Sequence, residues 1–222
     1  MATRLAARQT LAVNRKIDAA IFDLGGVLMR NGTPHDFAHR FPGVEPHIGV
    51  AAMMGPYGLD TDHPWHRLER GEITMAEFRS ANRTTLIEAG ITIPTPAGRA
   101  PSIVFRRNEA MWTLVADLRA AGVKTSVLTN NVRELRPMWW SDDFEHHFDD
   151  IVDSHEVGMR KPNRAIYELA VQRLGVAAHR AAFLDDIASN VAAAAAIGIY
   201  GLQVLGAGGD AIELVRRLAG LT

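Results

Sequence analysis

The chain of 222 residues contains no cysteine. This absence excludes disulfide bonds, cysteine nucleophiles and thiolate metal sites, and it is typical of a cytosolic protein, so we expect a cytoplasmic location. The formal net charge is only -1, with 24 basic and 25 acidic side chains. Such a balance gives no electrostatic footprint for a nucleic acid, and we expect no nucleic-acid partner.

Long hydrophobic runs are also lacking. No stretch of about 18 apolar residues occurs, so we expect no membrane partner. Residues 1–17 are basic but lack the apolar core of a signal peptide, and we interpret them as an N-terminal extension. Hydrophobic residues nevertheless make up 47% of the chain, which is ample for a packed core.

Short apolar segments alternate with helical patterns through most of the chain. The candidate strands are 19–22, 121–130, 149–154, 181–186 and 199–206, and the candidate helices are 107–121, 163–174 and 187–197. Gly122 and Gly175 are placed to end the first two helices, and Pro162 is predicted to lie in the first turn of the second. This alternation predicts an α/β protein with a doubly wound parallel sheet, a Rossmann-like core.

The segment 34–102 interrupts this alternation. It contains no convincing strand but several helical patterns, one of which begins with a capping box formed by Thr74 and Glu77. We therefore assign residues 18–33 and 103–222 to an α/β core, and the intervening segment to an inserted helical cap.

Polar residues follow four of the predicted strands. In chain order they are Asp23, then Thr129 and Asn130, then Lys161, and finally Asp185 and Asp186 with Asn190 one helical turn later. Because ligands bind beyond the carboxyl ends of parallel strands, we expect these residues to share one crevice. Carboxylates without histidine or cysteine favour Mg²⁺, and a lysine would balance both carboxylates and phosphate. The set predicts phosphoryl transfer, with Asp23 free to act as the nucleophile.

Four sequence motifs carry a resemblance to a known family. FDLGGVL, VLTNN, GMRKP and FLDDIASN, in this order, resemble the motifs of the haloacid dehalogenase-like (HAD) hydrolase superfamily. The resemblance runs from residue 18 to about residue 206, and the insertion resembles the helical cap of that superfamily's phosphatases. GMRKP and FLDDIASN are similar in particular to sugar-phosphate phosphatases and to the phosphatase half of soluble epoxide hydrolases.

The resemblance implies a magnesium-dependent phosphatase that acts on a small phosphorylated metabolite, with sugar phosphates among the candidates. We expect a monomer or a homodimer. By resemblance, Asp23 is the nucleophile, and the other roles are phosphate binding by Thr129, Asn130 and Lys161, metal binding by Asp23, the Gly25 carbonyl, Asp185 and Asp186, and support by Asn190.

One position departs from the family pattern. The family's phosphatases usually carry a second Asp two residues after the nucleophile, where it protonates the leaving oxygen, but this chain has Gly25. The departure keeps a second hypothesis open, a catalytically weak phosphate-binding or regulatory protein. Dehalogenation on the same fold is less favoured, because that branch lacks the metal-binding pair seen here as Asp185 and Asp186.

Three further expectations concern the surroundings of this site. The segment VLMRNGT is expected to form a short hairpin flap that turns at Asn31-Gly32. Trp139 and Trp140 are expected to be packing residues. The cap histidines are expected to be mostly solvated, although one of them could replace the missing acid; they are His35, His39, His47, His63 and His66.

Overall fold

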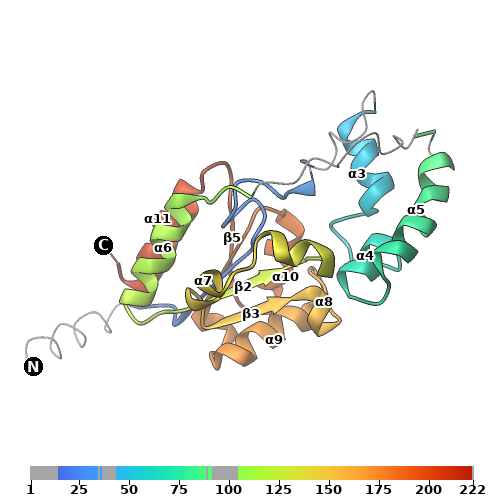
Figure 1. Cartoon of the computed structure of the whole chain (residues 1–222). Coiled ribbons are helices and arrows are strands. Elements are labelled where there is room, and N and C mark those ends of the chain that lie inside the picture. The colour runs from blue at the N-terminus through green and yellow to red at the C-terminus, as the bar shows by residue number, and fades with distance from the viewer. Residues whose placement is uncertain (1–14, 35, 37–43, 89, 92–104, 222) are drawn as a thin grey trace, which may run out of the picture.

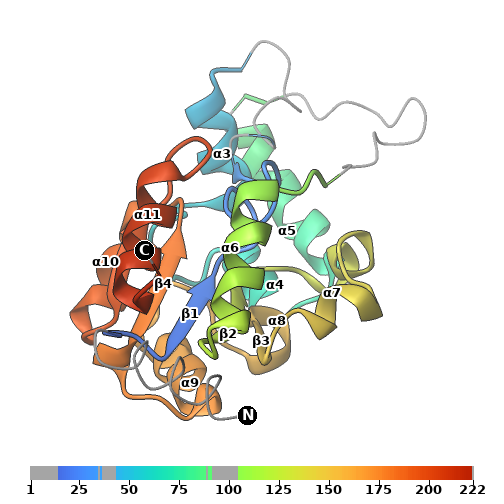
Figure 2. The same ribbon diagram turned by 90° about the vertical axis from the view of Figure 1, so that its left-hand side faces the viewer.

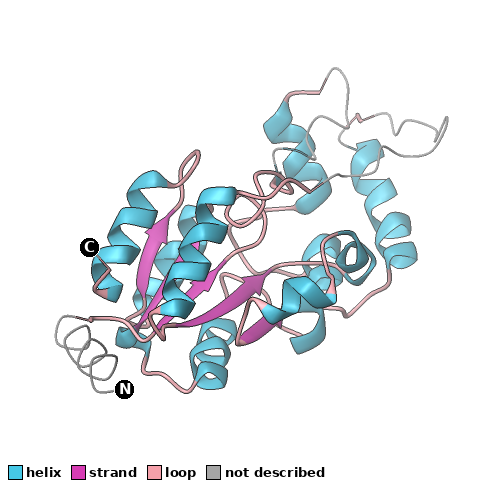
Figure 3. Cartoon of the chain, turned by 60° about the vertical axis from the view of Figure 1, so that its left-hand side comes forward, coloured by secondary structure: helices cyan, strands magenta, loops and turns pink. Residues whose placement is uncertain are grey.

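The computed structural model describes residues 15–34, 36, 44–88, 90–91 and 105–221. Within them, five parallel strands form one sheet in the order β3-β2-β1-β4-β5. The strands are β1 (Ala19–Phe22), β2 (Lys124–Thr129), β3 (Asp150–Asp153), β4 (Ala181–Asp185) and β5 (Tyr200–Gln203). The predicted doubly wound parallel sheet is therefore confirmed, and Figure 3 shows its strands between layers of helices.

Helices cover both faces of the sheet (Figures 1 and 2). They are α6 (Glu109–Ala120) and α11 (Gly209–Ala219) on one face, and α9 (Arg164–Leu174) and α10 (Ala188–Ala196) on the other. Phe22 shares a buried cluster with Leu114 of α6 and Val215 of α11. The preceding Ile21 shares another with Ile166 of α9 and Ala194 of α10. Neighbouring side chains of β1 thus point to opposite faces, and both faces are buried.

The sequence patterns miss several helices and misplace one helix start. Outside the inserted segment, the unpredicted helices are η1 (Arg133–Met138), α7 (Asp142–His146), α8 (Ser154–Val157), η2 (Ala178–Arg180) and α11. Helix α9 begins at Arg164, because the Asn163 side chain caps it by accepting a hydrogen bond from Ala165 N at 3.0 Å. The prediction that Pro162 lies in the first turn of this helix is therefore wrong.

Three helices of the inserted segment stand at one end of the core (Figure 1). They are α3 (Pro46–Met54), α4 (Pro64–Glu69) and α5 (Met75–Glu88). Trp65 of α4 packs edge-on against Phe78 of α5, with ring centroids 5.4 Å apart, in a small apolar cluster that includes Met54. The predicted capping box is present, since Glu77 N donates to Thr74 Oγ1 at 3.2 Å and Thr74 N donates to the Glu77 carboxylate at 2.7 Å.

The start of the described chain packs on the core. Of the predicted extension 1–17, the structure describes residues 15–17, of which Ile17 is fully buried. Lys16 N donates to Leu218 O of α11 at 2.7 Å. No helix in the described part of the chain has the length and apolar character needed to cross a membrane.

The chain turns back sharply after β1. Gly26 has a φ of 74°, and Met29 N donates to Leu24 O at 2.8 Å, so the turn is formed at the glycines. The expected hairpin flap at Asn31-Gly32 is wrong, because Met29 instead forms an isolated antiparallel bridge with Arg107. The segment is thereby tied to the core close to the strand ends.

Candidate active site

The carboxyl ends of neighbouring strands bring the predicted site residues together. Asp23 follows β1, Thr129 ends β2 and Asp185 ends β4. Asp23 N donates to Leu184 O at 2.8 Å, which places Asp23 beside Asp185. Strand β1 lies between β2 and β4, where the winding of the sheet reverses, and open α/β sheets bind ligands at this point.

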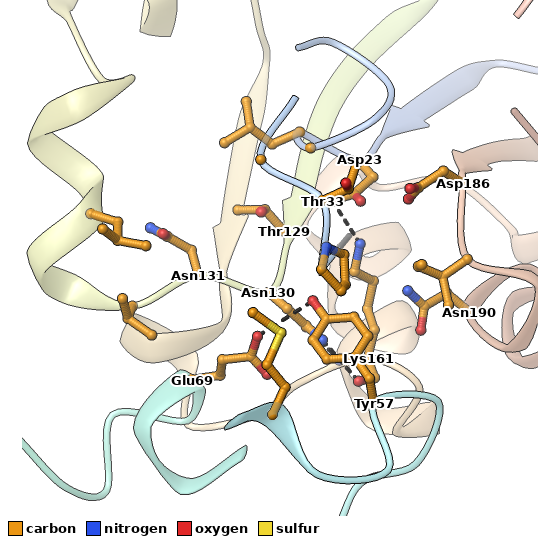
Figure 4. Close-up of a pocket in the computed structure, with 18 of the residues that line it drawn as sticks. Asp23, Thr33, Tyr57, Glu69, Thr129, Asn130, Asn131, Lys161, Asp186 and Asn190 are labelled. Atoms are coloured by element: carbon orange, nitrogen blue, oxygen red, sulfur yellow. Dashed lines mark hydrogen bonds and ion pairs between the residues drawn. The ribbon is translucent and has the colours of Figure 1, made fainter. Parts of the chain in front are cut away.

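Lys161 links two of the carboxylates. Its Nζ atom lies 2.8 Å from Asp23 Oδ1 and 2.6 Å from Asp185 Oδ2. The Lys161 side chain is 1% exposed, so both ion pairs are shielded from water. Figure 4 shows Lys161 reaching up to Asp23, with Asp186 beside them.

The charges of this cluster do not balance. Burial raises the pKa of the Asp23 carboxyl, and the charges of Asp185 and Asp186 raise it further against the attraction of Lys161. Burial, followed by the charge of Asp185, raises the pKa of Asp186 to about 6. Burial disfavours the Lys161 ammonium, but the carboxylates of Asp185 and Asp23 outweigh it and raise its pKa. Three ionised carboxylates and one ammonium sum to -2, so the ionised cluster requires a further cation.

The donor set fits Mg²⁺. One carboxylate oxygen from each of Asp23, Asp185 and Asp186 lies within 4.8 Å of the other two. A cluster of oxygen donors suits a hard divalent cation. Gly26 lets the turn approach this cluster, because a Cβ atom there would lie 2.5 Å from Asp186 Oδ2. Gly25 lines a cavity beside this cluster, together with Asp23 and Asp186.

Two amide side chains hold the charged groups in place. Asn190 Nδ2 lies 3.1 Å from each oxygen of Asp185 and donates to that carboxylate. Asn130 donates to Lys161 O at 2.9 Å and accepts from Lys161 N at 2.7 Å. The Asn130 side chain therefore positions Lys161, while phosphate binding by Asn130 stays a prediction.

A cavity of about 60 Å³ lies between this cluster and the cap. Thr129, Lys161 and Asp186 line its core side. Figure 4 shows Tyr57 and Glu69 of the cap facing the same space. Further lining residues that the sequence analysis did not assign to the site are Met54, Trp65, Phe105 and Trp139. Trp139 also packs against Trp140, as expected, with ring centroids 5.7 Å apart.

The described histidines of the cap do not line the cavity. His66 is fully buried, and burial lowers its pKa to about 4, so the expectation of a solvated ring is wrong for this residue. Burial also lowers the pKa of the half-buried His63. His47 is exposed. His35 and His39 lie outside the described residues.

A buried arginine of the core is anchored in the cap. Arg160, beside Lys161 in the GMRKP motif, has no exposed surface, and its Nε donates to Glu69 Oε2 at 2.8 Å. Its guanidinium also donates to the backbone carbonyls of Leu59 and, at 3.4 Å, of Tyr57. Sequence reasoning passed over Arg160 because its partner Glu69 lies 91 positions away.

The sequence of the chain matches the model of a known protein family. The model for haloacid dehalogenase-like hydrolases matches residues 17–198. The chain belongs to this family. The resemblance drawn from the four motifs is thereby confirmed, as is the assignment to hydrolases.

Curated relatives include a phosphatase of similar length. The chain is 29% identical over 206 residues to the sesquiterpene phosphatase astK of Aspergillus oryzae, covering 91% of this chain and 96% of the relative. It is 31% identical over 203 residues to acyl-CoA dehydrogenase family member 10 of Mus musculus, covering 89% of this chain but 19% of the relative. It is 27% identical over 224 residues to bifunctional epoxide hydrolase 2 of Rattus norvegicus, with coverages of 83% and 36%. This chain thus spans only a minor part of the last two proteins.

Solved structures show the same fold with different ligands. One is the HAD family enzyme BT-2542 of Bacteroides thetaiotaomicron in complex with magnesium and inorganic phosphate, with a TM-score of 0.55, 20% identity and coverages of 86% and 95%. Another is the L-2-haloacid dehalogenase of Xanthobacter autotrophicus with covalently bound chloropropionic acid, with a TM-score of 0.55, 20% identity and coverages of 85% and 77%. The same fold therefore occurs both in a protein that binds magnesium and phosphate and in a dehalogenase, so the fold alone does not decide the chemistry of this site.

Proposed function

We propose that the chain is a magnesium-dependent hydrolase of small phosphomonoesters that acts through an aspartyl-phosphate on Asp23. The observation that carries the proposal is the placement of Asp23 at the end of the central strand, paired with Lys161 beside Asp185 and Asp186. The hydrolase family and the relative named as a phosphatase support it.

The proposed reaction has two steps. In the first, a carboxylate oxygen of Asp23 attacks phosphorus, the bond from phosphorus to the alcohol oxygen breaks, and the departing alkoxide takes a proton from solvent. In the second, water cleaves the aspartyl-phosphate, releasing phosphate and regenerating Asp23. Lys161 and Thr129 would bind the phosphoryl oxygens throughout. Mg²⁺, when held by the carboxylates and the Gly25 carbonyl, would supply positive charge to the transferring group.

Two alternatives are less well supported. Dehalogenation has no need of the carboxylate cluster that Asp185 and Asp186 complete around Asp23. A weak phosphate-binding or regulatory protein is motivated by Gly25, which offers no acid to the leaving group. The first alternative predicts halide release without metal, and the second predicts phosphate binding without turnover.

Metal removal tests the proposal directly. We expect EDTA to lower p-nitrophenyl phosphate hydrolysis by ~10²-fold or more, and excess Mg²⁺ to restore it, because the ionised carboxylates otherwise repel an anionic substrate. Phosphate release would be followed by absorbance, with phosphate affinity measured in parallel by calorimetry. Full activity in the chelator would contradict the magnesium assignment, and tight phosphate binding without turnover would favour the regulatory alternative.

Gly25 has no room for the family's usual acid. A Cβ atom at this position would lie 2.7 Å from the carbonyl oxygen of Gly32, which is backbone and cannot rotate away. We expect Gly25→Asp to lower the free energy of unfolding by ~1–3 kcal/mol and to reduce activity, because the turn that carries Asp23 must shift.

The matched control is Gly209→Asp at the first position of α11. A Cβ atom there meets no neighbour within 4 Å, so unfolding in urea and phosphate release should stay close to wild type. A Gly25→Asp variant of normal stability that hydrolyses alkyl phosphates faster than wild type would show that the turn admits the acid.

A further inference from the structure

The wall of the cavity away from the charged cluster is mostly apolar. The cap contributes Met54, Tyr57 and Trp65 to it, and the core contributes Phe105, Leu135 and Trp139. In the proposed reaction the phosphoryl group lies against Asp23 and Lys161, so the alcohol part of the substrate faces this wall. The character of the wall therefore selects the alcohol.

Apart from the indole of Trp139, the polar side chains in the described part of the wall already have partners. The Glu69 carboxylate accepts from Arg160, and the Tyr57 hydroxyl lies 3.5 Å from Glu69 Oε1. Asn131 Nδ2 donates to Asp153 Oδ2 at 2.9 Å.

Two more polar side chains of the wall are engaged in the same way. Thr33 Oγ1 donates to the Asp36 carboxylate at 2.8 Å, and the Asn130 amide is bound to the backbone of Lys161. The indole N–H of Trp139 is buried without a partner, but one donor cannot satisfy the several hydroxyls of a sugar.

We infer that the site takes the phosphate ester of an apolar alcohol and discriminates against hydroxyl-rich alcohols such as sugars. The inference rests on the proposed function. A sugar placed against this wall loses its water and regains only part of its hydrogen bonds, whereas a hydrocarbon ring gains contact with Trp65, Phe105 and Leu135.

A pair of substrates of similar shape tests the inference. Cyclohexylmethyl phosphate and glucose 6-phosphate are both phosphates of a primary alcohol on a six-membered ring, and they differ mainly in the ring oxygen and hydroxyls. We expect kcat/KM to be ~10-fold or more higher for cyclohexylmethyl phosphate. Equal efficiencies or a preference for glucose 6-phosphate would overturn the inference.

Wall variants separate selection by the wall from a general effect on catalysis. Leu135→Gln introduces an amide into the partly buried wall, and Phe105→Tyr adds a hydroxyl with little change in volume. Each should reduce the preference for the cyclic ester by several fold, and the control Leu205→Gln should not, because Leu205 is 72% exposed and outside the described lining. An unchanged preference in both wall variants would overturn the assignment of selectivity to this wall.

The activity of the wild-type protein distinguishes failure of the substrate inference from failure of the proposed function. Hydrolysis of p-nitrophenyl phosphate without any preference between the matched esters overturns the substrate inference alone. No phosphate release from any ester in the presence of Mg²⁺ overturns the proposed function, and the inference with it.

Discussion

Replacing Asp23 with Asn should lower phosphate release by at least ~10⁴-fold with Mg²⁺ present, because the amide has the shape of the carboxylate but cannot attack phosphorus. The side chain lies against Lys161 and beside Asp185, and it is the predicted carboxylate at the end of the central strand. Beryllium fluoride, which mimics an aspartyl-phosphate, should bind the wild-type protein in calorimetry and should not bind this variant.

The matched control lies at the other end of the same strand. Asp18 immediately precedes β1 and pairs with Arg15 and Arg180, away from the carboxyl ends of the strands. Asp18→Asn should keep turnover within a few fold of wild type, even where its unfolding midpoint changes. Turnover above a hundredth of wild type in the folded Asp23→Asn protein would mean that another residue or a bound water makes the attack.

The sheet was predictable because its signals are local. Short apolar segments that alternate with helical patterns indicated the five strands, and the order of polar residues along the chain indicated the strand ends that bring these residues together. The sequence-based predictions were least accurate for the helix starts and the turns. Asn163 rather than Pro162 sets the start of α9, and Gly26 rather than Asn31-Gly32 forms the turn after β1, because each is decided by a hydrogen bond or a φ angle that the sequence pattern does not display.

The cap side of the site could not be predicted for a different reason. Tyr57 and Glu69 line the cavity and contact Arg160, and nothing in the spacing of these residues indicates that pairing. The burial of His66 likewise depends on how α4 packs, not on the sequence near it. The lack of space for a side chain at Gly25 also depends on the tertiary structure, because the atom that a Cβ would meet belongs to Gly32.

Arg160 connects the cap side of the cavity to the strand ends of the candidate site. Its side chain has no exposed surface, its partner Glu69 is 1% exposed, and Ser154 of the core also donates to the Glu69 backbone carbonyl at 2.6 Å. Burial raises the pKa of Glu69 against the attraction of Arg160. Removing the arginine would leave the buried Glu69 carboxylate without its direct ion-pair partner, which is far costlier than losing an exposed ion pair.

We expect Arg160→Met to lower the free energy of unfolding by about 3–5 kcal/mol near neutral pH, measured in urea. The control Arg164→Met loses only an exposed pair with Glu168 four positions away, and should cost ~0.3–0.5 kcal/mol.

The stability of Arg160→Met should depend on pH. In the folded variant, Glu69 should keep its proton to higher pH than it does in the unfolded chain, so the free energy of unfolding should fall as the pH rises. The loss of stability should therefore be smaller near ~pH 5 than near ~pH 8. Adding Glu69→Gln, which removes the unpaired charge, should recover part of the loss. A penalty no larger than that of Arg164→Met, and independent of pH, would contradict a buried ion pair that holds the cap.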